Sequence, residues 1–320
     1  MRSSLFVAFA VCFSAALSQA QTYPARPIRM VIDTSPGGVT DILGRLSADW
    51  LTQQLGRQIV VENRGGASGS IAIDYVIKAP PDGYTLLMLA GGNLVMTPFL
   101  VADVSFDPLS DLVAVFNIAE TPHMLVVPRA LPVNDLAEFV GYAKANPGKI
   151  SYGSPGTGSP PHLSLDQFSR VTGVQMVHVP YKGAFQIVPD LIAGRLQAAS
   201  LSLGSTRAGL KGGAIKALAI GATKRLAGLP EVPTTAEAGV PGWHMTAWFG
   251  IFAPKGTSVD VVGLLNAKMQ LMIDDAKTRV RLVELGAEPL GGPATAFAER
   301  VRADYKDFGQ MVKDSGIKAQ

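Results

Sequence analysis

The chain has 320 residues, of which 48% are hydrophobic and 17% are charged, and its formal net charge is +3. This length is sufficient for two ordinary domains with separate cores, and the low charged fraction excludes an intrinsically disordered chain. The basic residues form no clustered run, so the sequence also argues against a nucleic-acid partner.

The first 20 residues have the pattern of a secretory signal peptide. Arg2 precedes an apolar stretch from Leu5 to Leu17, and Ser18 and Ala20 are the small residues expected for cleavage after Ala20. A membrane anchor is the alternative, but a spanning helix needs about 20 apolar residues, and this stretch is shorter. We therefore expect an exported, periplasmic protein. The single cysteine, Cys12, lies in this segment, so the mature chain has no thiol for a disulfide or a nucleophile.

Strand and helix patterns alternate at the start of the mature chain. The expected elements are a strand at 28–32, a helix at 41–55, a strand at 59–61, a helix at 71–79 and a strand at 84–89. This alternation is typical of a parallel sheet covered by helices.

The alternation begins again at residue 124. Strands are expected at 124–127, 150–152, 176–179, 196–201, 215–220 and 243–252, and helices at 134–145, 161–171, 184–193 and 205–211. From residue 258 the chain is mostly helical, and we expect this tail to pack on the first unit. The sequence thus predicts an α/β fold with a discontinuous first domain (residues 21–123 and 246–320) and a second domain (residues 124–245). The two strands that cross between them would form a hinge.

Three loops rich in Gly, Ser and Thr follow expected strands, and open parallel sheets bind ligands at these carboxyl ends. The loops are residues 35–41, 90–93 and 154–159. Two of them run into helices, whose free N–H groups and partial positive charge suit a carboxylate or phosphate. The alternative is that such loops merely begin helices. Their matching positions in two tandem units favour a shared ligand site.

The candidate ligand-binding residues include these loops and neighbouring positions. They are Ser35, Pro36, Gly37, Gly38, Thr40, Asp41, Gly92, Asn93, Ser154, Gly156, Thr157, Gly158, His162, Tyr181 and Leu203. Asp41 is expected to organise its loop, and His162 either contacts the ligand or hydrogen-bonds the loop. Lys182 and Arg207 could add positive charge, although a solvated side chain is the ordinary interpretation of each. Trp248 and Phe249 are expected in the core.

Signals for catalysis are weak. The chain lacks a phosphate loop ending in Gly-Lys-Ser/Thr and a Gly-x-Ser-x-Gly elbow, and residues 156–161 lack the last glycine of a dinucleotide fingerprint. The histidines at 123, 162, 178 and 244 have no metal-ligand spacing. We therefore expect binding without catalysis, cofactor or metal. An enzyme that uses His162 with Asp166 or Asp41 is the alternative.

Several short motifs occur in a fixed order along the mature chain. They are Pro36-Gly37-Gly38 with Asp41, Glu62-Asn63-Arg64, Pro81-Asp82-Gly83-Tyr84, Asn146-Pro147-Gly148, Pro180-Tyr181-Lys182-Gly183 and Val240-Pro241-Gly242. Together they resemble the substrate-binding proteins of tripartite tricarboxylate transporters, the Bug family. The resemblance implies two Rossmann-like domains with parallel or mixed sheets and a ligand cleft between them, as in type II periplasmic binding proteins.

The resemblance also implies a function and partners. The ligand would be a small carboxylate, such as a di- or tricarboxylate, an acidic amino acid or an aromatic acid. A monomer would deliver it to the membrane components of a tripartite-type transporter. The alternative is that the protein presents its ligand to a sensor kinase rather than to a transporter.

Two positions depart from the family pattern. Val39 stands where the family has a third glycine, which predicts a stiffer first loop. Leu201-Ser202 replaces a pair of an acid and an amide, which predicts a more apolar wall and a ligand with an aromatic or aliphatic body.

Overall fold

The computed structural model describes residues 23–181 and 186–317; the predicted signal peptide and Lys182 lie outside these ranges. The strands are β1 (Ile28–Ile32), β2 (Ile59–Asn63), β3 (Thr85–Ala90), β4 (Leu112–Pro128), β5 (Ile150–Ser154), β6 (Met176–Pro180), β7 (Ala198–Ser202), β8 (Ile215–Ile220), β9 (Thr246–Pro254) and β10 (Glu288–Pro289). The helices are α1 (Val39–Leu55), 3-10 turn η1 (Ala67–Gly69), α2 (Ser70–Ile77), α3 (Gly91–Val95), α4 (Thr97–Leu100), α5 (Leu136–Ala145), α6 (Pro160–Thr172), α7 (Ile187–Ile192), α8 (Leu203–Lys211), α9 (Val259–Asp274), α10 (Ala276–Glu284) and α11 (Ala294–Ser315).

The strands follow the order β2-β1-β3-β9-β4-β7-β5-β6, and β8 and β10 also pair with β4. β1 is parallel to β2 and β3, and β5 is parallel to β6 and β7. The predicted alternation of strands and covering helices is therefore confirmed in both halves of the chain. β9 is antiparallel to both β3 and β4, so the complete sheet is mixed.

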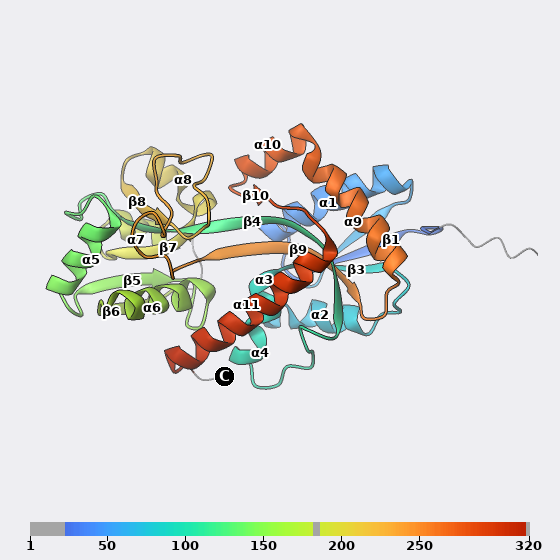
Figure 1. Cartoon of the computed structure of the whole chain (residues 1–320), viewed down its shortest axis with the longest axis horizontal. Coiled ribbons are helices and arrows are strands. Elements are labelled where there is room, and N and C mark those ends of the chain that lie inside the picture. The colour runs from blue at the N-terminus through green and yellow to red at the C-terminus, as the bar shows by residue number, and fades with distance from the viewer. Residues whose placement is uncertain (1–22, 182–185, 318–320) are drawn as a thin grey trace, which may run out of the picture.

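Strand β4 changes partners along its length. From Leu112 to Pro122 it pairs with β9, whereas from His123 onward it pairs with β7 and β8. Figure 1 shows the result: two groups of helices and strands, joined by β4 and β9. The α/β fold with two units is confirmed.

Each half has its own buried clusters. In the first half, Ile28 and Met30 of β1 pack with Leu265 and Met269 of α9, so the C-terminal helices cover the sheet formed by the N-terminal strands. A second cluster on this half places Phe297 of α11 against neighbouring buried side chains. In the second half, two clusters lie on either side of β4, β5 and β7. Trp248 and Phe249 are buried as expected.

The structure corrects two sequence predictions. Residues 91–95, expected to begin as a loop, form the short helix α3. A methyl group added at Gly91 would lie 2.1 Å from the Trp248 indole, so only glycine allows α3 to pack this closely on β9. The last long strand begins at Thr246 rather than at Trp243, because the Trp243 backbone N–H donates to the Val240 carbonyl oxygen in a turn instead of joining the sheet.

The contact between α11 and β9 gives a stability prediction. A side chain at Gly250 would place its first carbon 2.2 Å from the Phe297 ring and 3.2 Å from the Phe116 carbonyl oxygen. Gly250→Val should therefore lower the free energy of unfolding by about 1–3 kcal/mol, measured by urea denaturation. The control is Gly263→Ala in α9, where no atom lies within 4 Å of the added carbon. This control should raise stability by about 0.5–1 kcal/mol. Equal losses in the two variants would contradict the packing described.

Candidate ligand-binding site

The start of α1 presents unbonded backbone donors. Gly38 is the N-cap with an extended backbone, and no side chain caps the helix. The N–H groups of Val39, Thr40 and Asp41 therefore have no partner within the helix, as at any uncapped N-terminus. Ser35, Pro36, Gly37 and Gly38 are exposed, whereas Thr40 and Asp41 are buried. This exposed loop, with donors at its end, suits an anionic group.

Asp41 holds this loop in place, as expected from the sequence. Its carboxylate accepts hydrogen bonds from the Gly37 backbone N–H (2.9 Å), Asn63 Nδ2 (2.9 Å) and Arg45 Nε (3.0 Å). Burial acts to raise the pKa of Asp41, but the bonds from Arg45, Gly37 and Asn63 outweigh it and hold the pKa below its usual value. Asp41 is therefore an ionised organiser of the loop, with its oxygens already occupied.

A second carboxyl, Asp33, was not identified from the sequence. It directly follows β1, is 2% exposed, and accepts a hydrogen bond from Asn93 Nδ2 at 2.8 Å. Its Oδ1 is buried without a partner among the described residues. Burial raises the pKa of Asp33 to about 7, against the opposing effect of the Asn93 bond. The predicted candidate Asn93 thus has a definite task, which is to hold this carboxyl.

The turn after β2 is a further feature that the sequence did not single out as a site. Ala67 and Ser68 have φ values of 46° and 53°, which side-chain-bearing residues rarely adopt. Gly69 lies against this same group, since an added carbon there would be 3.0 Å from Asn93 and 3.2 Å from Asp33 Oδ2. Backbone strain of this kind concentrates at functional sites. The Gly-rich run from Arg64 to Ser70 was the available signal.

In the second half, the loop after β5 is held by its own side chains. Ser154 is fully buried, and its Oγ donates to the Gly156 carbonyl oxygen at 2.9 Å. His178 Nε2 lies 2.6 Å from the same Oγ, so the ring donates Nε2–H to Ser154. Ser159 Oγ donates to the Gly156 carbonyl oxygen at 2.7 Å. Thr157 at the tip of the loop is exposed.

His162 contacts this loop and a second histidine. Its Nδ1 accepts a hydrogen bond from the Gly158 backbone N–H at 3.0 Å, which requires an unprotonated Nδ1 and leaves Nε2–H as a donor. The His162 ring stacks on His178 with centroids 3.7 Å apart and planes at 16°. Burial lowers the pKa of both rings, and that of His178, which also lies beside His162, falls to about 4. The loop is therefore held by two neutral imidazoles.

The alternative interpretation as an enzyme requires His162 to pair with Asp166 or Asp41. Asp166 forms an ion pair with Arg170 on the same helix, and Asp41 is held by Arg45 and Asn63, whereas the hydrogen bond at His162 comes from the Gly158 backbone N–H. Within residues 23–181 and 186–317, no group of three His, Cys, Asp or Glu side chains is arranged to hold a metal ion. Over the same ranges, no helix combines the length and apolar character needed to cross a bilayer.

The two halves approach each other at the predicted loops. A carbon added at Gly92 in α3 would lie 3.4 Å from Pro160 of α6, and one added at Gly158 would lie 3.2 Å from Leu100 of α4. The second and third predicted loops thus lie where the two halves are in contact, and the first loop belongs to the same half as the second. α6 begins with Pro160 and Pro161, which lack N–H groups, so it offers fewer backbone donors than α1.

The remaining candidates have structural partners. Tyr181 donates its hydroxyl to Asp190 Oδ2 at 2.6 Å, and the Leu203 side chain is 6% exposed in a buried cluster, which leaves only its backbone at the start of α8. Arg207 donates to the Glu284 carbonyl oxygen at 3.1 Å and so links α8 to α10. The apolar wall predicted at Leu201-Ser202 is wrong for Leu201, whose side chain is 1% exposed within the core.

A family model described as "Tripartite tricarboxylate transporter family receptor" matches residues 43–317. The chain belongs to this family. BugT of Bordetella pertussis is 34% identical over 95% of this chain and 94% of that protein. Among solved structures, R. palustris Rpa4515 with adipate is 36% identical with a TM-score of 0.78, and covers 93% of this chain and 100% of that one. MatC from Rhodopseudomonas palustris with bound malate is 30% identical with a TM-score of 0.73, and covers 91% of this chain and 100% of that one.

The predicted membership of the Bug family is therefore confirmed. Members of this family are solute-binding receptors, which agrees with a site made of loops and helix starts rather than of a nucleophile and its base.

The stacked histidines of this receptor give a pH prediction. An unfolded His takes up a proton near pH 6.5, whereas folded His178 resists protonation until about pH 4. The unfolded chain thus binds more protons in this window, and the stability due to neutral His178 is lost as the pH falls through it. His178→Gln should flatten this fall between pH 6.5 and pH 4.5, measured by urea denaturation at each pH.

Asp33 and buried His123 also titrate across part of this range, but both are present in parent and variant, so they cancel in the difference. If stability depended on pH identically in the parent protein and in His178→Gln, the interpretation of His162 and His178 as two neutral imidazoles would be contradicted.

Proposed function

We propose that this protein is exported to the periplasm, captures one small carboxylate between its two domains, and delivers it to the membrane components of a tripartite-type transporter. The domains are residues 21–123 with 246–320, and residues 124–245. The observation that carries the proposal is the start of α1, where the backbone N–H groups of residues 39–41 lack partners beside an exposed loop. The adipate and malate held by two relatives of the same fold support a carboxylate as the ligand.

The charges around the loop favour this ligand over a cation. The helix N-terminus carries about half a positive charge, and the Asp41 carboxylate is paired with Arg45 and directed at the loop backbone. Neutral backbone donors bind a carboxylate without a buried ion pair, which suits capture followed by release. In this proposal the second domain adds the loop at 154–159 and the Nε2–H of His162 from the opposite side.

Gly37 provides the first test. Its φ is 92° with nothing within 4 Å, so Gly37→Ala strains the loop without a clash. Gly148 is a matched control, since its φ is 72°, its surroundings are equally open, and it precedes β5 rather than following a strand. Both alanine variants should lose about 1 kcal/mol of stability. Only Gly37→Ala should also weaken carboxylate binding. We expect a loss of affinity of about tenfold or more, which corresponds to about 1.4 kcal/mol of binding free energy.

The measurement is a thermal-shift titration with adipate, malate, acidic amino acids and aromatic acids, because a ligand that binds the folded state raises the melting temperature by mass action. Equal affinities of the two variants for the best ligand would exclude the α1 loop as the site. Turnover of the ligand would overturn the receptor function itself.

Asp33 gives a pH test of the same site. Its carboxyl has a pKa of about 7 and is two residues from the exposed loop, so its ionisation above pH 7 adds a negative charge beside the bound carboxylate. Affinity should therefore fall as the pH rises from 6 to 8, and Asp33→Asn should remove most of this fall. Isothermal titration of the best ligand at both pH values measures the effect. An unchanged pH dependence in Asp33→Asn would separate Asp33 from the site.

A further inference from the structure

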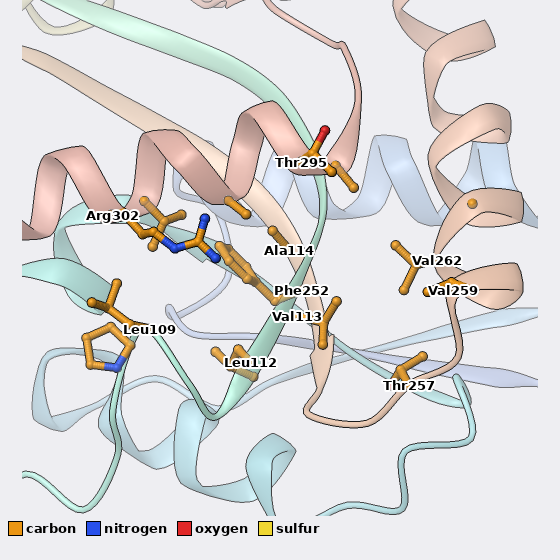
Figure 2. Close-up of a pocket in the computed structure, with 15 residues that line it drawn as sticks. Leu109, Leu112, Val113, Ala114, Phe252, Thr257, Val259, Val262, Thr295 and Arg302 are labelled. Atoms are coloured by element: carbon orange, nitrogen blue, oxygen red, sulfur yellow. The ribbon is translucent and has the colours of Figure 1, made fainter.

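A groove of about 460 Å³ lies on the first half of the molecule, between α9 and α11 and over β4 and β9 (Figure 2). Its buried lining is apolar, with Ala114, Phe252, Val262 and Val301 all less than 9% exposed. Val259 at its edge is 85% exposed, so the groove opens to solvent on this side. None of the candidate carboxylate-binding residues lines this groove.

The groove contains one charge. Of its lining residues only Arg302, on α11, is charged, and Figure 2 shows its guanidinium reaching from the helix over the groove near Phe252. Among the described residues Arg302 makes neither a hydrogen bond nor an ion pair. Its neighbour Arg300 differs, since it pairs with Glu120 at 2.7 Å. Four acids, Asp107, Asp111, Asp260 and Glu299, adjoin lining residues in the sequence, but none of them is part of the lining, and Asp111 accepts from the Asp107 backbone N–H at 2.8 Å.

We propose that this groove is a second ligand site that binds a free fatty acid, with the aliphatic chain on the apolar lining and the carboxylate on the Arg302 guanidinium. The guanidinium matches a carboxylate with two parallel hydrogen bonds. The volume lies within the range of small-molecule sites, which is about 300–1,000 Å³. A dicarboxylate does not fit this pattern, because its second charge would lie against apolar side chains without a partner. The two sites therefore select different acids.

The chain length of the ligand gives the first measurement. Isothermal titration of the mature protein with octanoate, decanoate and dodecanoate should show one site, with affinity rising about fourfold per methylene until the groove is full. Dodecanol should bind at least about tenfold more weakly, because it lacks the charge that Arg302 recognises. Equal binding of dodecanoate, dodecanol and dodecyltrimethylammonium would overturn the proposal, since it would reduce the groove to a nonspecific apolar surface.

Two variants locate the site. Arg302→Gln should reduce dodecanoate affinity to that of dodecanol, whereas Lys306→Gln, an exposed cation on the same helix outside the lining, should leave it unchanged. Gly263 lines the groove, and a carbon added there meets nothing within 4 Å, so Gly263→Phe has room for its first carbon, places a ring at the groove and favours the helix relative to glycine. This variant should abolish dodecanoate binding, keep the melting temperature, and leave malate or adipate binding unchanged.

Other occupants would give other results. Loss of dodecanoate binding in Gly37→Ala but not in Gly263→Phe would place the acid at the α1 loop and overturn the proposal. A dimer of the parent protein in sedimentation that Gly263→Phe dissociates would identify a second copy as the occupant. Binding to phosphatidylglycerol vesicles without binding of free dodecanoate would identify a membrane surface, and either result would contradict the fatty-acid site.

Discussion

The partner exchange within β4 is the constraint on which the rest of the structure depends. One continuous strand, Leu112–Pro128, pairs with β9 up to Pro122 and with β7 and β8 beyond it. Because each half builds its own parallel strands on this shared element, the loop that follows β1 and the loop that follows β5 belong to opposite halves. These halves meet where α3 and α4 contact α6 and the loop before it. A pair of crossing strands can also bend with little loss of hydrogen bonding, which suits closure on a ligand.

The two loops achieve order by different means. The loop before α1 is organised by a charged carboxylate, Asp41, which holds its backbone and leaves the helix N–H groups unpaired. The loop before α6 ends at two prolines, which begin the helix, and is organised by neutral groups, Ser154 with His178 and Gly158 with His162. A carboxylate between them would thus meet backbone donors on one side and an imidazole N–H on the other. Asp33 is buried close to the first loop. Because its pKa is raised to about 7, the charge beside this loop changes with pH near neutrality.

Much of the fold could be predicted, because periodic apolar strands and capped helices are local signals. The parallel units, the role of Asp41 and the positions of the two main loops follow from such signals. The helix α3 could not be predicted, since it depends on the contact of Gly91 with Trp248, which is 157 positions later. Likewise, the His162–His178 stack and the burial of Asp33 are products of tertiary packing between distant segments. Leu203 shows the converse, because a strand-end position that suggested a ligand contact places its side chain in the core.

Amide hydrogen exchange with and without the best-binding carboxylate tests the central claim most directly. If the ligand is held between the halves, exchange should slow at residues 39–41, whose amides lack helix partners, and also in the segment 156–162 of the other half. Residues 136–145 of α5 should change little, because α5 lies at the outer end of the second half, far from α1 (Figure 1). Protection confined to one half, or spread evenly over the whole chain, would contradict capture of a carboxylate between the two domains.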